Sequence, residues 1–197
     1  MAGGRGSGAF RQPREKRELT AGSSTATESE PDPESVARTI GLRLLTAAPR
    51  SRRQLADAFE RHGVPSDVAG RVLDRFVEVG LVDDAEYARV LVRSQHSNRG
   101  LSGRALRFEL RKRGIDEEIA EVAVSELSAD DVEGTARALV ARKLRAMSGL
   151  NRETRVRRVW GLLARKGYSP SVIARLVREM VDDRTLSDPA DAGSRDV

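Results

Sequence analysis

The chain has 197 residues, of which 39% are hydrophobic, 33% charged and 4% aromatic, with a formal net charge of +5. It has no cysteine and two histidines, which excludes disulfides, thiolate nucleophiles and the usual zinc sites. No apolar run approaches the roughly 18 uncharged residues that span a bilayer, and the first residues do not resemble a secretory signal. We therefore expect a cytoplasmic, helix-rich, basic protein that needs no cofactor.

The two ends of the chain lack the apolar residues of a folded domain. Residues 1–33 are rich in Gly, Ser, Thr and Pro, with little besides Phe10 and Leu19 that could be buried. This composition predicts a disordered N-terminal extension. Residues 184–197 lack apolar periodicity and are predicted to form a C-terminal tail. About 150 residues remain, enough to bury a core without disulfides.

An apolar pattern occurs three times in the region between these ends. Two apolar residues and a glycine follow one another at spacings of four, and a second apolar stripe begins five residues after the glycine. The three sets are Leu55, Phe59 and Gly63; Leu106, Leu110 and Gly114; and Val159, Leu163 and Gly167. This spacing predicts two amphipathic helices joined by a tight turn, with the glycine left-handed just after the first helix.

A further helix is predicted before each pair, beginning near Ser35, Asp83 and Asp130. Asp83 and Asp130 each precede an acid by three residues, an arrangement that predicts capping boxes rather than a catalytic or metal-binding acid pair. Asp116, Ser169 and, in the first copy, Ser66 are the predicted caps of the helices after the glycine turns. The resulting fold class is all-α, with three tandem three-helix repeats at 34–82, 83–129 and 130–183. Because such repeats share a core along one direction, we expect an elongated monomer.

The motifs of these repeats resemble the RecX family over almost all of residues 34–183. The first repeat carries Pro49-Arg50-Ser51 before a helix with a Gln54-Leu55 pair. The second opens with Asp83-Asp84 and continues with Tyr87, Ala88, Leu91, Arg93, Gly100, Arg104, Glu109, Leu110, Lys112, Gly114 and Ile115. Leu91 stands where the family often has an aromatic residue. The third repeat matches through Lys143, Trp160, Leu163 and Gly167-Tyr168.

This resemblance implies a regulator of the bacterial recombinase RecA, built as a curved array of helical repeats. Such proteins bind the RecA filament on single-stranded DNA and inhibit its ATP hydrolysis, strand exchange and co-protease activity. They are not enzymes. The resemblance therefore implies a role in recombination, DNA repair and the SOS response, with the RecA filament, and single-stranded DNA within it or directly, as partners.

The basic residues gather in two parts of the predicted fold, residues 99–113, with six bases against one acid, and residues 137–166. Ten lie between Arg137 and Lys166 against one acid, whereas residues 114–133 hold eight acids and no base. The positive charges between Arg137 and Lys166 repel one another unless phosphate or an acidic partner neutralises them. Pairing with the neighbouring acidic helix would lower the exposed charge. The predicted partner-binding residues are Arg99, Arg104, Arg107, Arg111, Lys112, Arg113, Arg142, Lys143, Arg145, Arg152, Arg155 and Arg158, with Arg104, Arg107 and Arg111 forming one solvent-facing row.

Other candidates for chemistry are weaker. His62 is expected at a helix end, and His96 in a polar connection over residues 94–100. Trp160 and Tyr168 could stack on nucleic-acid bases, but the position of Trp160 in the stripe of Val159 and Leu163 predicts that it lies in the core. No phosphate-binding loop or nucleophile–base set is present, so we expect no catalytic residue and no bound metal. The alternative function is a DNA-binding regulator with helix-turn-helix-like units. The basic helix at residues 104–113 lacks the Asn and Gln that usually read bases, which disfavours this alternative.

Overall fold

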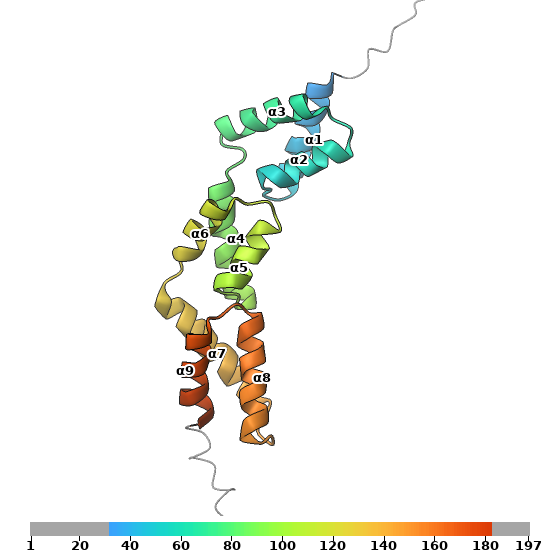
Figure 1. Cartoon of the computed structure of the whole chain (residues 1–197). Helices are drawn as coiled ribbons and strands as arrows, with labels where there is room; N and C mark the ends of the chain where they lie inside the picture. The colour runs from blue at the N-terminus through green and yellow to red at the C-terminus, as the bar shows by residue number, and fades with distance from the viewer. Residues whose placement is uncertain (1–31, 183–197) are drawn as a thin grey trace, which may run out of the picture. The chain divides into compact units, whose positions relative to one another are not determined.

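The computed structural model describes residues 32–182, all within the unit of the chain that runs from Pro31 to Val197. This described part contains nine α-helices and no strand, which confirms the predicted all-α fold (Figure 1). Residues 1–31 and 183–197, which carry nearly all of the predicted extension and the tail, lie outside the described residues. The helices are α1 (Pro33–Ala47), α2 (Arg52–Arg61), α3 (Ser66–Glu78), α4 (Asp84–Arg99), α5 (Gly103–Arg111), α6 (Glu117–Ser125), α7 (Ala129–Arg145), α8 (Arg152–Arg165) and α9 (Pro170–Val177). A short π-helical turn, Arg178–Asp182, follows α9.

The helices pack in three consecutive sets of three, as the repeated pattern predicts. Helix α1 contacts α2 and α3, α4 contacts α5 and α6, and α7 contacts α8 and α9. Each set has a hydrophobic core of its own, and the predicted stripes supply it. Leu55 and Phe59 are fully buried in the first core, Leu110 in the second and Leu163 in the third. Each three-helix set is called a repeat below.

Helix starts agree with the sequence at several positions and differ at others. Asp83, Asp116 and Ser169 cap their helices by accepting hydrogen bonds from backbone amides two or three residues later. Helix α1 begins at Pro33, earlier than predicted, because Asp32 accepts from the amides of Glu34 and Ser35. Residues 32 and 33 therefore belong to the first repeat rather than to the N-terminal extension.

Two predicted caps are wrong. Helix α7 begins at Ala129, because Ser128 accepts from the amide of Asp131 at 3.0 Å and takes the role assigned to Asp130. Asp130 instead lies in the first turn, where its negative charge faces the positive end of the helix dipole. In the first repeat Pro65 occupies the cap position without a side-chain hydrogen bond, and Ser66 is the first helical residue.

The three turn glycines adopt the predicted left-handed conformation. Their φ angles are 72° at Gly63, 73° at Gly114 and 90° at Gly167. A side chain on Gly114 would collide with Arg53 of the first repeat, and one on Gly167 would collide with the backbone at Ser102 and Ala105 of the second repeat. The space around Gly63 is open within 4 Å. The second and third turns therefore serve as close packing points between repeats.

Neighbouring repeats meet in a recurring way, where the serine that begins one helix contacts the end of another. The Oγ of Ser51, before α2, donates to the carbonyl of Arg113, after α5, at 2.6 Å. The amide of Ser102, before α5, donates to the carbonyl of Lys166, after α8, at 2.8 Å. Both serines are buried. The first and second repeats thus each dock the start of their second helix onto the glycine turn of the following repeat.

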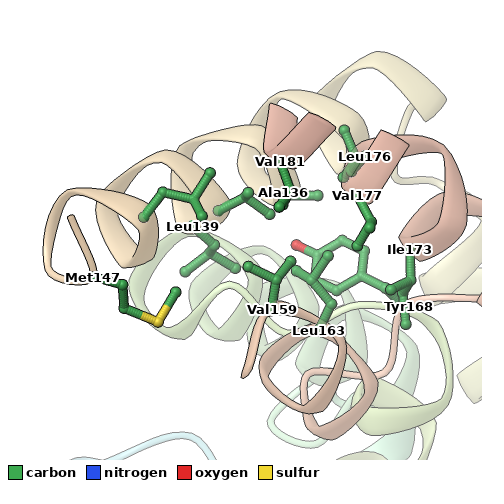
Figure 2. Close-up of a cluster of buried hydrophobic side chains, with 12 residues drawn as sticks. Ala136, Leu139, Met147, Val159, Leu163, Tyr168, Ile173, Leu176, Val177 and Val181 are labelled. Carbon is green, nitrogen blue, oxygen red and sulfur yellow. The ribbon is translucent and has the colours of Figure 1, made fainter. Parts of the chain in front are cut away.

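The third core differs from the prediction at Trp160. Its side chain is 41% exposed, whereas Val159 and Leu163 on the same helix are fully buried. Figure 2 shows the ring of Tyr168 among Val159, Leu163 and other apolar side chains, so a tyrosine fills the centre of this core. Burial raises the pKa of Tyr168 to about 12, and its hydroxyl has no hydrogen-bond partner within the described residues. Trp160 lies at the edge of its stripe and faces outward.

His96 also differs from the prediction, because it lies inside α4 and is buried. Its Nδ1 lies 2.8 Å from the carbonyl of Leu101, so this nitrogen is the donor. Its Nε2 lies 3.0 Å from the hydroxyl of Thr135 on α7 and accepts from it. His96 therefore helps to hold the second repeat against the third.

Candidate functional site

The solvent face of α5 carries two unpaired arginines. Leu106 and Leu110 bury one face of this helix, and Arg104 and Arg111 are exposed on the other. Neither arginine forms an ion pair with any residue of the 32–182 region. Both guanidinium groups are therefore available for a phosphate or a carboxylate of a partner.

Arg107, the middle member of the predicted row, is not free. Its side chain is half-buried, and its Nε and Nη2 donate to the two carboxylate oxygens of Glu121 on α6. These hydrogen bonds raise the pKa of Arg107 and lower the pKa of Glu121. The prediction of a fully solvent-facing row is wrong at this position because α6 packs beside α5 and brings an acid to Arg107. Arg107 therefore joins two helices of the second repeat.

Arg113 likewise forms an ion pair within the protein, with Glu109. Its Nη1 donates to Glu109 Oε2 at 2.6 Å and to the carbonyl of Glu109 at 2.8 Å. Arg113 holds the pKa of Glu109 below its usual value. Its own carbonyl accepts from Ser51 of the first repeat. Of the neighbouring basic residues, Lys112 is exposed, and Arg99 is exposed with a long 3.8 Å approach to Glu109.

The third repeat presents further cations on α7 and α8. Arg142, Arg145, Arg152 and Arg158 are exposed, and Lys143 and Arg155 are half-buried. Among the described residues, no acid pairs with Arg142, Lys143, Arg145, Arg155 or Arg158. Arg137 differs from these residues, because it pairs with Glu133 at 2.8 Å and with Glu179.

Acids from residues 114–133 pair with basic residues of neighbouring helices. They neutralise part of the basic charge, as the sequence allowed. Glu126 at the end of α6 pairs with Arg89 on α4 at 3.0 Å. Glu133 on α7 pairs with both Arg137 and Arg175, and these arginines lower its pKa. These acids thus join helices to one another, whereas Arg104 and Arg111 of α5 and Arg155 and Arg158 of α8 have no acidic partner among the described residues.

The junction between α5 and α8 is hollowed in two adjoining places. The first hollow, of about 420 Å³, is lined by Arg104 and Arg107 of α5, Trp160 of α8 and the start of α9. The second, of about 370 Å³, is lined by Arg99, Arg104, Phe108, Arg111 and Arg165. Arg104, Ala164 and Gly167 line both hollows.

This junction brings together some of the predicted residues and not others. Arg99, Arg104 and Arg111 meet around the hollows, whereas the predicted residues of α7 and the N-terminal part of α8 line neither of them. Phe108 and Arg165, which line the second hollow, were not among the predicted site residues, and Trp160, which lines the first, was expected in the core. Phe108 carried a usable signal, since it lies two residues from each of Leu106 and Leu110 and so projects from the opposite helix face.

Lys166 and its neighbours show how crowded with cations the junction is. The Lys166 ammonium donates to the carbonyl of Arg99 across the two repeats. Burial, and then the charges of Arg99 and Arg142, lower the pKa of Lys166. Within residues 32–182 there is no group of three His, Asp or Glu side chains that could hold a metal ion, and no helix there is long and apolar enough to cross a membrane.

Comparison with known proteins identifies the same three repeats. Models of the first, second and third three-helix domains of RecX match residues 37–76, 83–124 and 131–177. The regulatory protein RecX of Streptomyces lividans is 51% identical over 163 residues, which are 82% of this chain and 87% of that protein. The regulatory protein RecX of Thermobifida fusca is 54% identical over 146 residues, 74% of this chain and 79% of that protein.

A solved structure shows the same fold at low sequence identity. The crystal structure of RecX from Lactobacillus salivarius superposes with a TM-score of 0.71 at 21% identity, covering 76% of this chain and 97% of that one. The chain shares the family's three helical domains in order, and it is half identical to relatives of nearly its own length. The chain therefore belongs to the RecX family.

Proposed function

We propose that this chain is a regulatory protein that binds the RecA recombinase and its filament on single-stranded DNA. Binding inhibits ATP hydrolysis, strand exchange and co-protease activity, and so modulates recombination, DNA repair and the SOS response. Membership of a family whose relatives are named regulatory proteins supports a regulatory role. The single observation that supports a charged, phosphate-rich partner is that Arg104, Arg111 and Arg165, where the second and third repeats meet, have no acidic partner among residues 32–182.

The protein acts by binding, as a cytoplasmic monomer without a cofactor. Its partner contacts come from the exposed cations Arg99, Arg104, Arg111 and Lys112, and from Arg142, Lys143, Arg145, Arg152, Arg155 and Arg158 of the third repeat. Arg107 and Arg113 contribute indirectly, because their ion pairs with Glu121 and Glu109 fix the position of α5.

The competing proposal of a sequence-specific duplex reader has less support. The residues that α5 and its end expose are Arg104, Phe108, Arg111 and Lys112. Helices that read base edges in the major groove usually present Asn or Gln among their arginines, and this face has neither. The exposed face is better suited to phosphates than to base edges of a duplex.

The proposal is tested by DNA-dependent ATP hydrolysis of the RecA protein from the same organism. Increasing, substoichiometric amounts of this chain are added to filaments preformed on single-stranded DNA. We expect ATP hydrolysis to fall strongly at well below one copy per recombinase protomer. An unrelated protein of similar size and net charge serves as the control for simple masking of DNA. An unchanged hydrolysis rate, or equal inhibition by the control protein, would contradict the proposal.

A further inference from the structure

The two exposed aromatic side chains of the described region both lie at the junction of α5 and α8. Phe59, Phe76 and Tyr168 are buried and Tyr87 is half-buried, whereas Phe108 is 57% exposed and Trp160 is 41% exposed. Trp160 lines the first hollow and Phe108 the second. Exposure of large aromatic faces forgoes the hydrophobic stabilisation that burial provides, so two such faces at one place indicate a binding surface.

The charges around these aromatic residues are almost all positive. Arg99, Arg104, Arg111 and Arg165 line the second hollow, and its one acid, Glu109, is held by Arg113 at 2.6 Å. The side chains of Arg104, Arg111 and Arg165 make no hydrogen bond or ion pair in the part of the chain that the structure describes. Arg104 lines both hollows and so lies where a ligand that occupies both would pass. An anionic ligand would relieve the repulsion among these cations.

We propose that these two hollows bind a short stretch of single-stranded nucleic acid, with Trp160 and Phe108 as stacking faces for unpaired bases and Arg104 as a phosphate contact between them. Flat aromatic faces beside a cationic groove are the recurring means by which proteins hold single strands. The inference rests on the proposed function, since it names single-stranded DNA as the component of the filament that this junction contacts.

Other anionic partners fit this surface less well. An acidic peptide would use the arginines and leave both aromatic faces without a planar partner. The bases of a duplex are stacked on one another, so Trp160 and Phe108 could not reach their faces without unstacking them. The surface therefore favours an unpaired strand over either alternative.

The test uses the fact that Trp160 is the single tryptophan of the chain. Oligothymidylate of about 15 nucleotides is titrated into the full-length protein at low salt while tryptophan fluorescence is recorded. Stacking of a base on the indole should quench the fluorescence in a saturable manner. A duplex of the same length at equal phosphate concentration should quench it much less. An oligouridylate arm shows whether the site also accepts RNA, which the same stacking chemistry permits.

Four variants locate the contacts by anisotropy of a labelled oligothymidylate. Trp160→Ala and Phe108→Ala should each weaken binding at least about fivefold, the lower end of what loss of one base–aromatic stack causes. Arg104→Glu should also weaken binding, because it replaces a phosphate contact with a negative charge. Trp160→Phe retains a stacking ring and should bind within about threefold of the wild type. Matched controls in the first repeat are Leu42→Ala, an exposed apolar residue, and Arg43→Glu, an exposed arginine. Both controls should bind within about twofold of the wild type, with helical circular dichroism confirming that every variant folds.

The outcomes separate this inference from the proposed function. Saturable quenching with selective loss in the junction variants supports the inference. If oligothymidylate does not quench Trp160 while the protein still inhibits recombinase ATP hydrolysis, the inference is wrong and the proposed function stands. Loss of inhibition in Arg104→Glu without any wild-type quenching would likewise overturn the inference in favour of an acidic protein partner. Quenching without inhibition would support the strand site and contradict the proposed function.

Discussion

At the scale of single residues, the turn glycines differ in what surrounds them although their backbone angles are alike. Gly63 and Gly167 both have a left-handed φ, but Gly63 faces open space and Gly167 faces the backbone of Ser102 and Ala105. A side chain at either position would destabilise the fold by about 1–2 kcal/mol, because residues other than glycine disfavour the left-handed conformation. Only at Gly167 must the neighbouring repeat also move.

This contrast gives a matched prediction. Gly63→Ala should lower the free energy of unfolding by about 1 kcal/mol. Gly167→Ala should lower it by clearly more, about 3 kcal/mol or above, because a backbone collision is added to the left-handed penalty. Urea denaturation followed by circular dichroism measures both values. Equal losses in the two variants would show that the turn at Gly167 does not pack against the second repeat.

At the scale of helices, the N-cap serines have unequal tasks. Ser51 closes a capping box with Gln54 and also donates to the carbonyl of Arg113 in the next repeat. Ser128 caps α7 at its exposed start and bonds only within its own helix. Loss of an N-cap costs about 1 kcal/mol, and a buried carbonyl left without its donor costs about 1–3 kcal/mol more. Ser51 therefore contributes to both a helix start and a repeat junction.

Substitution of the two serines separates these contributions. Ser51→Ala should reduce the free energy of unfolding by about 2 kcal/mol or more, and Ser128→Ala by about 1 kcal/mol. Chemical denaturation of both variants under identical conditions gives the comparison. A Ser51→Ala loss no larger than that of Ser128→Ala would remove the proposed role of Ser51 between repeats.

The ion pair between Glu109 and Arg113 predicts a dependence of stability on pH. Arg113 lowers the pKa of Glu109 in the folded protein from its ordinary value of 4.5. The pair therefore stabilises the fold above that value, and this contribution is lost as the pH falls through the lowered pKa. Glu109→Gln should be less stable than the wild type at pH 7 by about 1 kcal/mol or less. The difference should shrink below about pH 4, as measured by urea midpoints.

An exposed acid provides the control for this pH series. Glu60 on α2 is exposed, and the structure shows no ion pair for it among residues 32–182. The urea midpoint of Glu60→Gln should equal that of the wild type across the pH series. A stability gap between Glu109→Gln and the wild type that stays constant from pH 7 to pH 3 would contradict the assignment.

At the scale of the whole molecule, the sequence predicted the repeats because their signals are local. The spacing of Leu55, Phe59 and Gly63 and of its two later copies reflects helix periodicity and a left-handed turn, which neighbouring residues determine. The cap at Ser128 was mispredicted because a serine and an aspartate lie two residues apart and either could accept from the first amides. Local pattern alone does not choose between them.

The candidate site was less predictable because its properties depend on packing between segments far apart in the chain. Arg107 and Arg111 look equivalent in the sequence, yet Glu121 of α6 pairs with Arg107, and no acid of residues 32–182 pairs with Arg111. Trp160 belongs by periodicity to the edge of a buried stripe, yet it is exposed, and Val159, Leu163 and Tyr168 lie in the third core. Arg165 and Phe108 meet only because α8 ends against the start of α5.

The proposed inhibition of the recombinase depends on Arg104 and Arg111, the α5 cations without an ion pair among residues 32–182. The most direct test measures recombinase ATP hydrolysis on single-stranded DNA with the double variant Arg104→Glu, Arg111→Glu. Its control is Arg43→Glu, Arg61→Glu, two exposed first-repeat arginines outside any ion pair of the described region, which changes the net charge equally. The α5 variant should need at least about tenfold more protein for half-inhibition, and the control should match the wild type. Equal inhibition by both double variants would show that Arg104 and Arg111 do not carry the inhibition.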